Sequence, residues 1–474
     1  MTAAMEITRR HGKTLSRGGR RPDHAPAWID GIDNPYLQGL FAPTTVETSP
    51  QTLVVQGELP KDLRGAYFRN GTNPRHAPTN RYHWFDGDGM VSGIRFDEGA
   101  VVFASRWIRT QGFEHERESG GSIWPGVMGP FDFSLPLGPI KDTANTDLVY
   151  FRGHLLGLWY ESGAMYKLDP HSLETVGIET LDGRLTFPVS AHSKVEPASG
   201  DFIFFSYGDR PPYYRYGVAT PGGGLHLAEI ELPGPRRPHD IGVSANWSIV
   251  HDFPYYLDPE HFKRTGRRGL SFHREVPTRF GVLPRRGGNA QVRWFECEPC
   301  YMLHTVNCWE EGDWLVQVGC RTADPTVKGD PRDGELAGLL AYLTLQANLY
   351  EWRFNLKTGE VRERPLDALN AEFPTINRQL MGRQNRYAYL QSIPQESPAR
   401  FEGLVKYDLM TGSCQRYDYG EGIFGSEVSF APRSGAESED DGYLIEFVTD
   451  TSDWSSACWI FVFSAFSKDC RSRN

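Results

Sequence analysis

Residues 354–359 read FNLKTG, and this short stretch indicates the fold because the same pattern recurs along the chain. Residues 166–170 (YKLDP) and residues 407–412 (YDLMTG) share its form, in which the end of a strand runs into a polar turn that starts the next strand. The hairpins of an antiparallel meander need turns of this kind. Four-stranded meanders repeated along one chain are typical of a β-propeller, so the pattern predicts that architecture.

Strand-like runs on both sides of these turns support the same interpretation. They are short, rich in β-branched and aromatic residues, and separated by Gly, Pro, Asn and Asp. We therefore predict an all-β fold, a seven-bladed β-propeller, because 474 residues give room for seven blades of roughly 60 residues. Few segments look helical. The best candidate, residues 335–345 (ELAGLLAYLTL), is too short to cross a membrane and predicts a surface helix or lid.

Charge and cysteine content limit the partners and the compartment. The formal net charge of -10 argues against a nucleic-acid partner, which normally needs a basic surface. Residues 1–28 are basic and lack an apolar run, so they predict a disordered tail ahead of a single propeller domain at residues 29–474. Seven cysteines without a secretion signal predict reduced thiols and a cytoplasmic location, with peripheral contact to a membrane left open.

An apolar loop at residues 123–137 (IWPGVMGPFDFSLPL) has two interpretations. Its prolines exclude a core helix or a central strand. The loop either forms a mouth that faces a substrate or a membrane, or folds onto the core, and its composition does not decide between the two.

Three of the 14 histidines stand in similar contexts, each close to the start of a predicted strand: His192, His239 and His304. They follow one another at intervals of 47 and 65 residues, roughly one blade each. In a propeller the innermost strand of every blade lines the central axis, so imidazoles from different blades can surround one divalent metal without a local motif. A single histidine is more often a polar residue satisfied by hydrogen bonds, and spacing alone leaves both interpretations open.

Several motifs, in order, resemble the carotenoid cleavage oxygenase family from about residue 30 to about residue 460. The string HWFDGDGM is the most recognisable, and His192, His239 and His304 lie inside later motifs. The motifs are residues 57–65 (GELPKDLRG), 67–74 (YFRNGTNP), 83–90 (HWFDGDGM), 142–146 (DTANT), 191–194 (AHSK), 239–240 (HD), 293–307 (RWFECEPCYMLHTVN) and 372–376 (EFPTI).

The resemblance implies a propeller capped by a dome of loops and short helices, with one ferrous ion per chain on its axis. His192, His239 and His304 match three of the family's four histidine ligands. Three carboxylates that hydrogen-bond to ligand imidazoles, and so fix their tautomer, match Glu161, Glu372 and Glu427. No catalytic side chain is expected beyond the metal site.

The resemblance further implies cleavage of a conjugated C=C bond by O2 to give two carbonyl products, with a lipophilic polyene, a carotenoid or apocarotenoid, as substrate. The expected mouth of the substrate tunnel is formed by Trp124, Phe131, Phe133, Leu339 and Leu340. Family members that cleave phenolic stilbenes or phenylpropenes carry a lysine directly before the first of the three glutamates. Tyr160 takes that place here, which favours the carotenoid class and leaves the phenolic class as the alternative.

The chain departs from the family near its end, because no histidine follows His304 and the fourth ligand should lie beyond residues 440–443 (DDGY). Residues 462–474 do not resemble the family, which predicts a truncated or frameshifted C-terminus and an incompletely closed propeller. An unpaired strand edge, weak iron binding and low activity would follow. A catalytically inactive propeller that binds a lipophilic ligand is therefore the second alternative.

Overall fold

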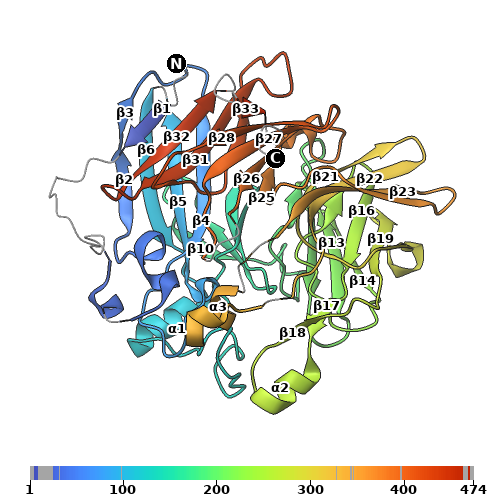
Figure 1. Cartoon of the computed structure of the whole chain (residues 1–474), viewed down its shortest axis with the longest axis horizontal. Coiled ribbons are helices and arrows are strands. Elements are labelled where there is room, and N and C mark those ends of the chain that lie inside the picture. The colour runs from blue at the N-terminus through green and yellow to red at the C-terminus, as the bar shows by residue number, and fades with distance from the viewer. Residues whose placement is uncertain are drawn as a thin grey trace.

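The computed structural model describes residues 5–8, 25–30, 32–97, 99–326, 328–341, 344, 346–394, 398–462 and 468–469. Within these residues, seven antiparallel sheets of four or more strands form the seven blades of a propeller (Figure 1). The predicted all-β, seven-bladed fold is confirmed.

The first three blades follow the chain order. The first contains β4 (Gly65–Thr72), β5 (Gly89–Asp97), β6 (Ala100–Trp107) and β2 (Thr48–Thr52). The second contains β7 (Asp147–Phe151), β8 (His154–Leu158), β9 (Met165–Leu168) and β10 (Thr175–Glu179). The third contains β11 (Lys194–Val195), β12 (Phe202–Tyr207), β13 (Tyr214–Ala219) and β14 (Leu225–Ile230).

The next three blades repeat the plan. The fourth contains β15 (Gly242–Val243), β16 (Trp247–Asp252), β19 (Thr278–Pro284) and β20 (Arg293–Cys297), with a side hairpin of β17 (Tyr255–Leu257) and β18 (Leu270–Phe272). The fifth contains β21 (Tyr301–Glu311), β22 (Trp314–Thr322), β23 (Asn348–Asn355) and β24 (Val361–Pro365). The sixth contains β25 (Ala371–Thr375), β26 (Tyr387–Ser392), β27 (Gly403–Asp408), β28 (Ser413–Asp418) and β33 (Lys468–Asp469).

The seventh blade joins the two ends of the chain. It contains β29 (Ile423–Phe424), β30 (Ser429–Pro432), β31 (Gly442–Asp450), β32 (Ser455–Val462), β1 (Met5–Thr8) and β3 (Val54–Gln56). Strand β32 pairs with β1, and β1 pairs with β3. The unpaired edge predicted for the C-terminal strands is therefore wrong for β32, because strands near the N-terminus cover it. Residues 1–4 and 9–24 of the predicted tail lie outside the described residues, whereas residues 25–28 are described, and the predicted domain boundaries stay a prediction.

The recurring turns connect the third and fourth strands of their blades. Residues 354–359 join β23 to β24, and residues 407–412 join β27 to β28. Gly359 (φ 86) and Gly412 (φ 68) have the left-handed backbone that these turns require. Residues 166–170 link β9 to β10 in the same way. The repeated sequence pattern thus marks the outer hairpin of three blades.

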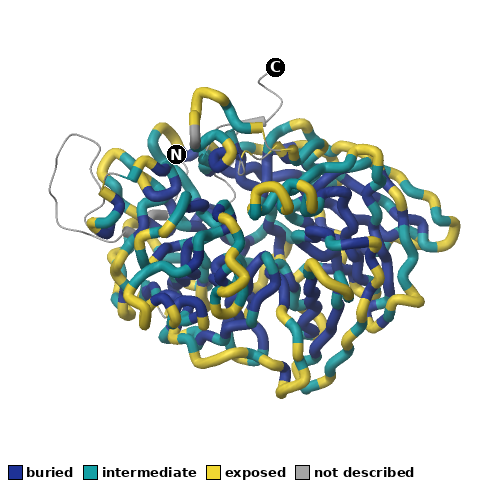
Figure 2. Tube along the Cα trace, turned by 90° about the horizontal axis from the view of Figure 1, so that it is seen from below, coloured by how far each residue is buried: buried dark blue, intermediate teal, exposed yellow. Residues whose placement is uncertain are grey.

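The core lies between neighbouring blades rather than in one central cluster. Val316 and Leu349 of the fifth blade, for example, pack with Leu390 and Val405 of the sixth. The buried stretches run through the interior, and the exposed ones follow the outer loops (Figure 2). On the axis side, β7 contacts β4 and β11, and β21 contacts β15 and β25. The innermost strands therefore form a ring that can carry a site built from several blades.

Five buried cysteines have free thiols, in agreement with the prediction: Cys297, Cys300, Cys308, Cys320 and Cys458. Cys414 is disulfide-bonded, so the prediction of reduced thiols is wrong at this position. Spacing along the chain does not show which thiols the fold brings within bonding distance.

Three short helices lie at one end of the propeller: α1 (Gln111–Ser119), α2 (Pro259–Thr265) and α3 (Ala337–Ala341) (Figure 1). Among the described residues of the predicted helix at 335–345, only those of α3 are α-helical, and its Leu339 and Leu340 pack against Tyr36 and Leu37. Among the described residues, no helix is both long enough and apolar enough to span a bilayer.

Candidate metal centre

Three imidazoles from three successive blades meet near the axis. His192 lies two residues before β11, His239 lies three residues before β15, and His304 is part of β21. One ring nitrogen of each can be chosen so that all three lie within 4.8 Å of one another. The ring centroids are 4.5 Å apart for His192 and His239, 4.8 Å for His192 and His304, and 5.1 Å for His239 and His304. The structure thus brings together the three histidines that sequence spacing had grouped.

The site favours neutral imidazoles at two of these positions. Burial lowers the pKa of His192 and His239 well below the usual value, and the neighbouring imidazoles add to the effect. Burial opposes the charged form of His304 as well, but the carboxylate of Glu372 raises the pKa of this imidazole. A neutral imidazole is the form that binds a metal.

A buried nitrogen without a partner shows that the site fits a metal ion. Nε2 of His192 is buried and has no hydrogen-bond partner among the described residues. Leaving such an atom unsatisfied costs about 1–3 kcal/mol, which a bound cation would offset. Three imidazole donors suit iron, zinc or copper. The residues present therefore fit a divalent transition metal held by His192, His239 and His304.

Glu372 orients one of the three rings. It lies in β25, is 1% exposed, and its Oε2 is 2.6 Å from Nδ1 of His304. The same oxygen accepts a hydrogen bond from the backbone N–H of Phe373. A carboxylate on Nδ1 fixes the tautomer and leaves Nε2 of His304 for the shared site.

The other two predicted carboxylates have different partners. Glu161 forms a buried ion pair with Arg268. Although burial opposes ionisation, Arg268 and Arg237 lower the pKa of Glu161. Glu427 is 41% exposed and lies 2.9 Å from Nε of Arg69. Neither hydrogen-bonds to the three imidazoles in the described structure, so their role as partners of ligand histidines stays a prediction.

The residues predicted for the tunnel mouth separate into a buried group and an aromatic pair, of which Phe131 is half-buried and Phe133 is exposed. Phe131 and Phe133 form an aromatic cluster with Phe262 of α2, and Phe133 is 68% exposed. Trp124 is buried, and its indole N–H donates to the backbone oxygen of Gly138. Leu339 and Leu340 are buried as well.

Two aromatic rings lie against the histidines, and of these sequence reasoning selected Tyr160 but not Phe373. The ring of Phe373 is 5.2 Å from that of His304, and the ring of Tyr160 is 6.5 Å from that of His239. Phe85 continues this wall, 5.1 Å from Tyr160. For Phe373, the sequence signal available was its place beside Glu372 in the EFPTI motif.

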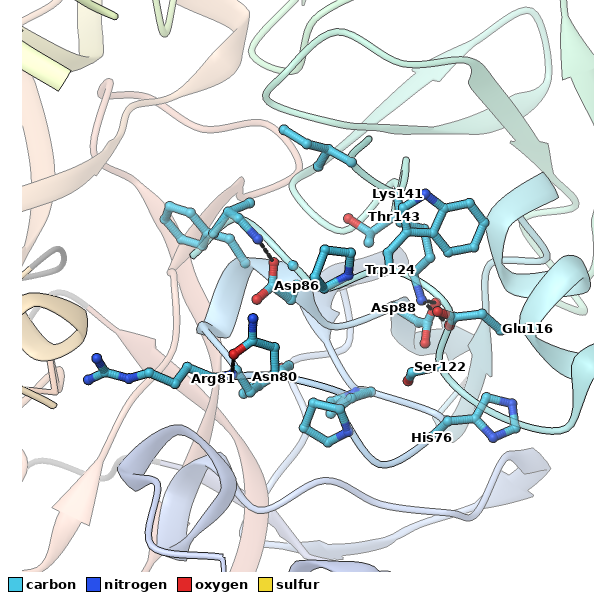
Figure 3. Close-up of a pocket in the computed structure, with 18 of the residues that line it drawn as sticks. His76, Asn80, Arg81, Asp86, Asp88, Glu116, Ser122, Trp124, Lys141 and Thr143 are labelled. Carbon is cyan, nitrogen blue, oxygen red and sulfur yellow. Dashed lines mark hydrogen bonds and ion pairs between the residues drawn. The ribbon is translucent and has the colours of Figure 1, made fainter. Parts of the chain in front are cut away.

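A small cavity near Trp124 contains buried charges (Figure 3). The ammonium of Lys141 lies 2.7 Å from Asp88 and 2.6 Å from Glu116. The cavity volume of ≈ 40 Å³ is far smaller than the roughly 300–1,000 Å³ of pockets that bind small-molecule ligands. We infer that these charges brace the loop of the HWFDGDGM motif, since a polyene would not fit there.

Known proteins resemble this chain over most of its length. The model of a family described as "Retinal pigment epithelial membrane protein" matches residues 41–473. Carotenoid 9,10(9',10')-cleavage dioxygenase 1 of Phaseolus vulgaris is 35% identical over 470 residues, covering 92% of this chain and 85% of the relative. Isoeugenol monooxygenase of Pseudomonas nitroreducens is 30% identical over 440 residues, covering 88% of this chain and 90% of the relative.

Two solved oxygenase structures also resemble this chain. Lignostilbene dioxygenase of Pseudomonas brassicacearum has a TM-score of 0.78 at 27% identity, covering 91% of this chain and 96% of that structure. Cobalt-substituted Synechocystis apocarotenoid oxygenase has a TM-score of 0.75 at 25% identity, covering 90% and 95%.

The family match also bears on the C-terminal prediction. It extends to residue 473 and therefore does not support the truncation or frameshift predicted from residues 462–474. The matching family model, described as "Retinal pigment epithelial membrane protein", is that of the carotenoid cleavage oxygenases. Together with the propeller and its three imidazoles, the matches show that the chain belongs to the carotenoid cleavage oxygenase family.

Proposed function

We propose that this chain is a non-haem Fe(II) dioxygenase that cleaves a conjugated C=C bond of a carotenoid or apocarotenoid with O2. The observation that carries the proposal is the cluster of three imidazoles with Glu372 on one of them. It occurs in a chain 35% identical to a carotenoid 9,10(9',10')-cleavage dioxygenase.

His192, His239 and His304 would hold the iron, one ion per chain. When bound, the ion supplies the binding and activation of O2. The chain's own residues orient the ligands and exclude water. Glu372 fixes the tautomer of His304, and the rings of Tyr160 and Phe373 make the surroundings apolar.

The stoichiometry requires no further co-reactant. One C=C bond and one O–O bond break, and two C=O bonds form, so both oxygen atoms end in the carbonyl products. No proton is gained or lost and no external reductant is consumed. This agrees with a site that needs no acid, base or nucleophile beyond the metal ligands.

A phenylpropenoid or stilbene substrate is the second candidate, because the chain also resembles isoeugenol monooxygenase and lignostilbene dioxygenase. Tyr160 argues against it, since the phenolic branch implies a lysine at that position. Lys194 lies close to the histidines, but its ammonium is paired with Asp240. A carotenoid end group needs no such cation, so the apolar wall favours the polyene.

Product analysis with the iron-loaded chain tests the proposal. The chain is loaded with Fe(II) without air, then given air and either an apocarotenal or a hydroxystilbene, and the products are identified by mass spectrometry. We expect carbonyl products from the apocarotenal and none from the variant His304→Ala. Products from the hydroxystilbene alone would favour the second candidate. A chain that holds iron but cleaves neither compound would indicate an inactive, ligand-binding propeller.

We also propose that the protein is cytoplasmic and collects its substrate at a membrane surface. The five free thiols support the location. The aromatic cluster of Phe131, Phe133 and Phe262 supports the membrane contact, since apolar side chains of this kind insert at the lipid interface. Exposed basic residues stand beside it, namely Lys263, Arg264 and Arg267.

Vesicle binding tests this contact. Replacing Phe131 and Phe133 by Ser removes the apolar contact, and we expect weaker co-sedimentation with vesicles of mixed neutral and anionic phospholipid. Tyr150→Ser, at an exposed aromatic residue of β7, is the matched control. Equal binding by the double variant and the unaltered chain would contradict the proposed contact.

A further inference from the structure

We propose that the ion pair of Lys194 and Asp240 positions the three histidines, and so fixes the segments that carry them relative to one another across three blades. The inference rests on the proposed function in one respect, that the histidines bind a metal. Lys194 and Asp240 stand in the motifs 191–194 and 239–240, but the sequence assigned neither of them a role at the metal site.

Asp240 makes the contacts that connect these segments. It directly follows His239 and is 2% exposed. Its Oδ1 accepts hydrogen bonds from Nζ of Lys194 at 2.5 Å and from the backbone N–H of Ile241 at 2.6 Å. Its Oδ2 accepts from the backbone N–H of Thr305, the residue after His304, at 2.7 Å. One carboxylate therefore connects the segments of two histidines from different blades.

Lys194 adds the third segment. It lies two residues after His192 and begins β11, and its ammonium also donates to the backbone oxygen of His192 at 3.2 Å. On the other side, the backbone N–H of His192 donates to Oδ2 of Asp147 at 3.0 Å. His192 has a left-handed backbone (φ 62) that an L-residue rarely adopts, so these two contacts hold it from both ends.

The sheet ladders do not hold the histidines by themselves. Strands β11 and β15 are two residues long, and their pairing begins at Lys194 and Gly242, after His192 and His239. In β21 the register shifts between Met302 and Thr305, around His304. Such irregularities re-aim a side chain but leave it less constrained. The Lys194–Asp240 pair supplies the constraint that regular pairing does not.

Removing one partner should therefore loosen the metal site more than the fold. Asp240→Asn keeps the shape and one acceptor but loses the charge, and Lys194→Met keeps the stem and loses the ammonium. We expect each variant to bind Co(II) and Fe(II) about 10- to 100-fold more weakly, the range found when residues that orient metal ligands are changed. The double variant should lose no more metal affinity than the single variant that binds metal more weakly, because both substitutions break the same contact.

Lys406 and Asp440 provide a matched control. Their ion pair is 2.6 Å long, and the two side chains are 9% and 22% exposed. Lys406 lies on β27, the third strand of the sixth blade. Lys406→Met should lower the melting temperature as much as Lys194→Met does, but should leave the affinity for Co(II) unchanged.

The experiment titrates the full chain with Co(II), following its absorption bands, and measures Fe(II) affinity by competition with a chelator. The expected result is weaker binding and an altered cobalt spectrum for Lys194→Met and Asp240→Asn alone. Wild-type affinity and spectrum in both variants would overturn the inference. If Asp240→Asn does not fold, Lys194→Met decides the question, since its side chain is 17% exposed.

The two proposals fail in different ways. An unaltered chain that binds metal but cleaves no alkene would overturn the proposed function, and the variant series would still decide the positioning role. An unaltered chain that binds neither Co(II) nor Fe(II) would overturn both.

Discussion

At the scale of single residues, His304 depends on a neighbour that lies 68 positions away in the sequence, Glu372. Glu372→Gln keeps the volume but removes the charge that fixes the imidazole tautomer. We expect about 10- to 100-fold weaker Fe(II) affinity in chelator competition. Glu351→Gln is the control, because that carboxylate is 7% exposed and pairs with Arg364 on the neighbouring strand β24, away from the histidines. Equal affinity in Glu372→Gln and the unaltered chain would contradict this role.

Glu446 predicts a dependence of stability on pH. It is fully buried and contacts Tyr419 and Gln391, and burial raises its pKa from the ordinary value of 4.5 to about 8. Because the folded pKa is the higher one, stability is intact below pH 4.5 and is lost as the pH rises toward 8. At neutral pH the loss is on the order of 3 kcal/mol.

The variant Glu446→Gln tests this dependence, because it cannot ionise. We expect its melting temperature to exceed that of the unaltered chain by a margin that grows as the pH rises from the ordinary carboxyl pKa of 4.5 toward the raised pKa of about 8. A margin that stays constant over this range would show that Glu446 does not titrate there.

At the scale of elements, strand β13 shows how tightly the blades are packed. A Cβ added at Gly217 would lie 2.2 Å from the ring of Phe204, on the paired strand β12. Gly217→Ala should therefore lower the free energy of unfolding by about 1–3 kcal/mol in urea titrations. Gly222→Ala, in the turn before β14, has open space and should change it little. Equal effects would contradict the packing argument.

The elements also show what sequence patterns can predict. The recurring turns at residues 354–359 and 407–412 are local, and each is a hairpin of the structure. The pairing of β32 with β1 joins strands from opposite ends of the chain, and no local pattern encodes it. The predicted helix at residues 335–345 begins only at Ala337, because Gly334 (φ 56) interrupts the helical backbone before it.

At the scale of the whole molecule, blade spacing and family motifs together predicted the fold and the three histidines. The partners of the carboxylates were not predictable, since Arg268 lies 107 residues from Glu161 and Arg69 lies 358 residues from Glu427. Such contacts depend on how side chains pack between and beneath the blades. The Lys194–Asp240 pair escaped prediction for the same reason, although both residues lie beside histidines.

The most direct measurement of the central claim is product analysis after reaction of the iron-loaded chain with an apocarotenal under ¹⁸O2. We predict two carbonyl products, each initially carrying one labelled oxygen atom, in amounts that follow the bound iron up to one ion per chain. Intact apocarotenal after incubation of a chain that holds a full equivalent of iron would contradict the account.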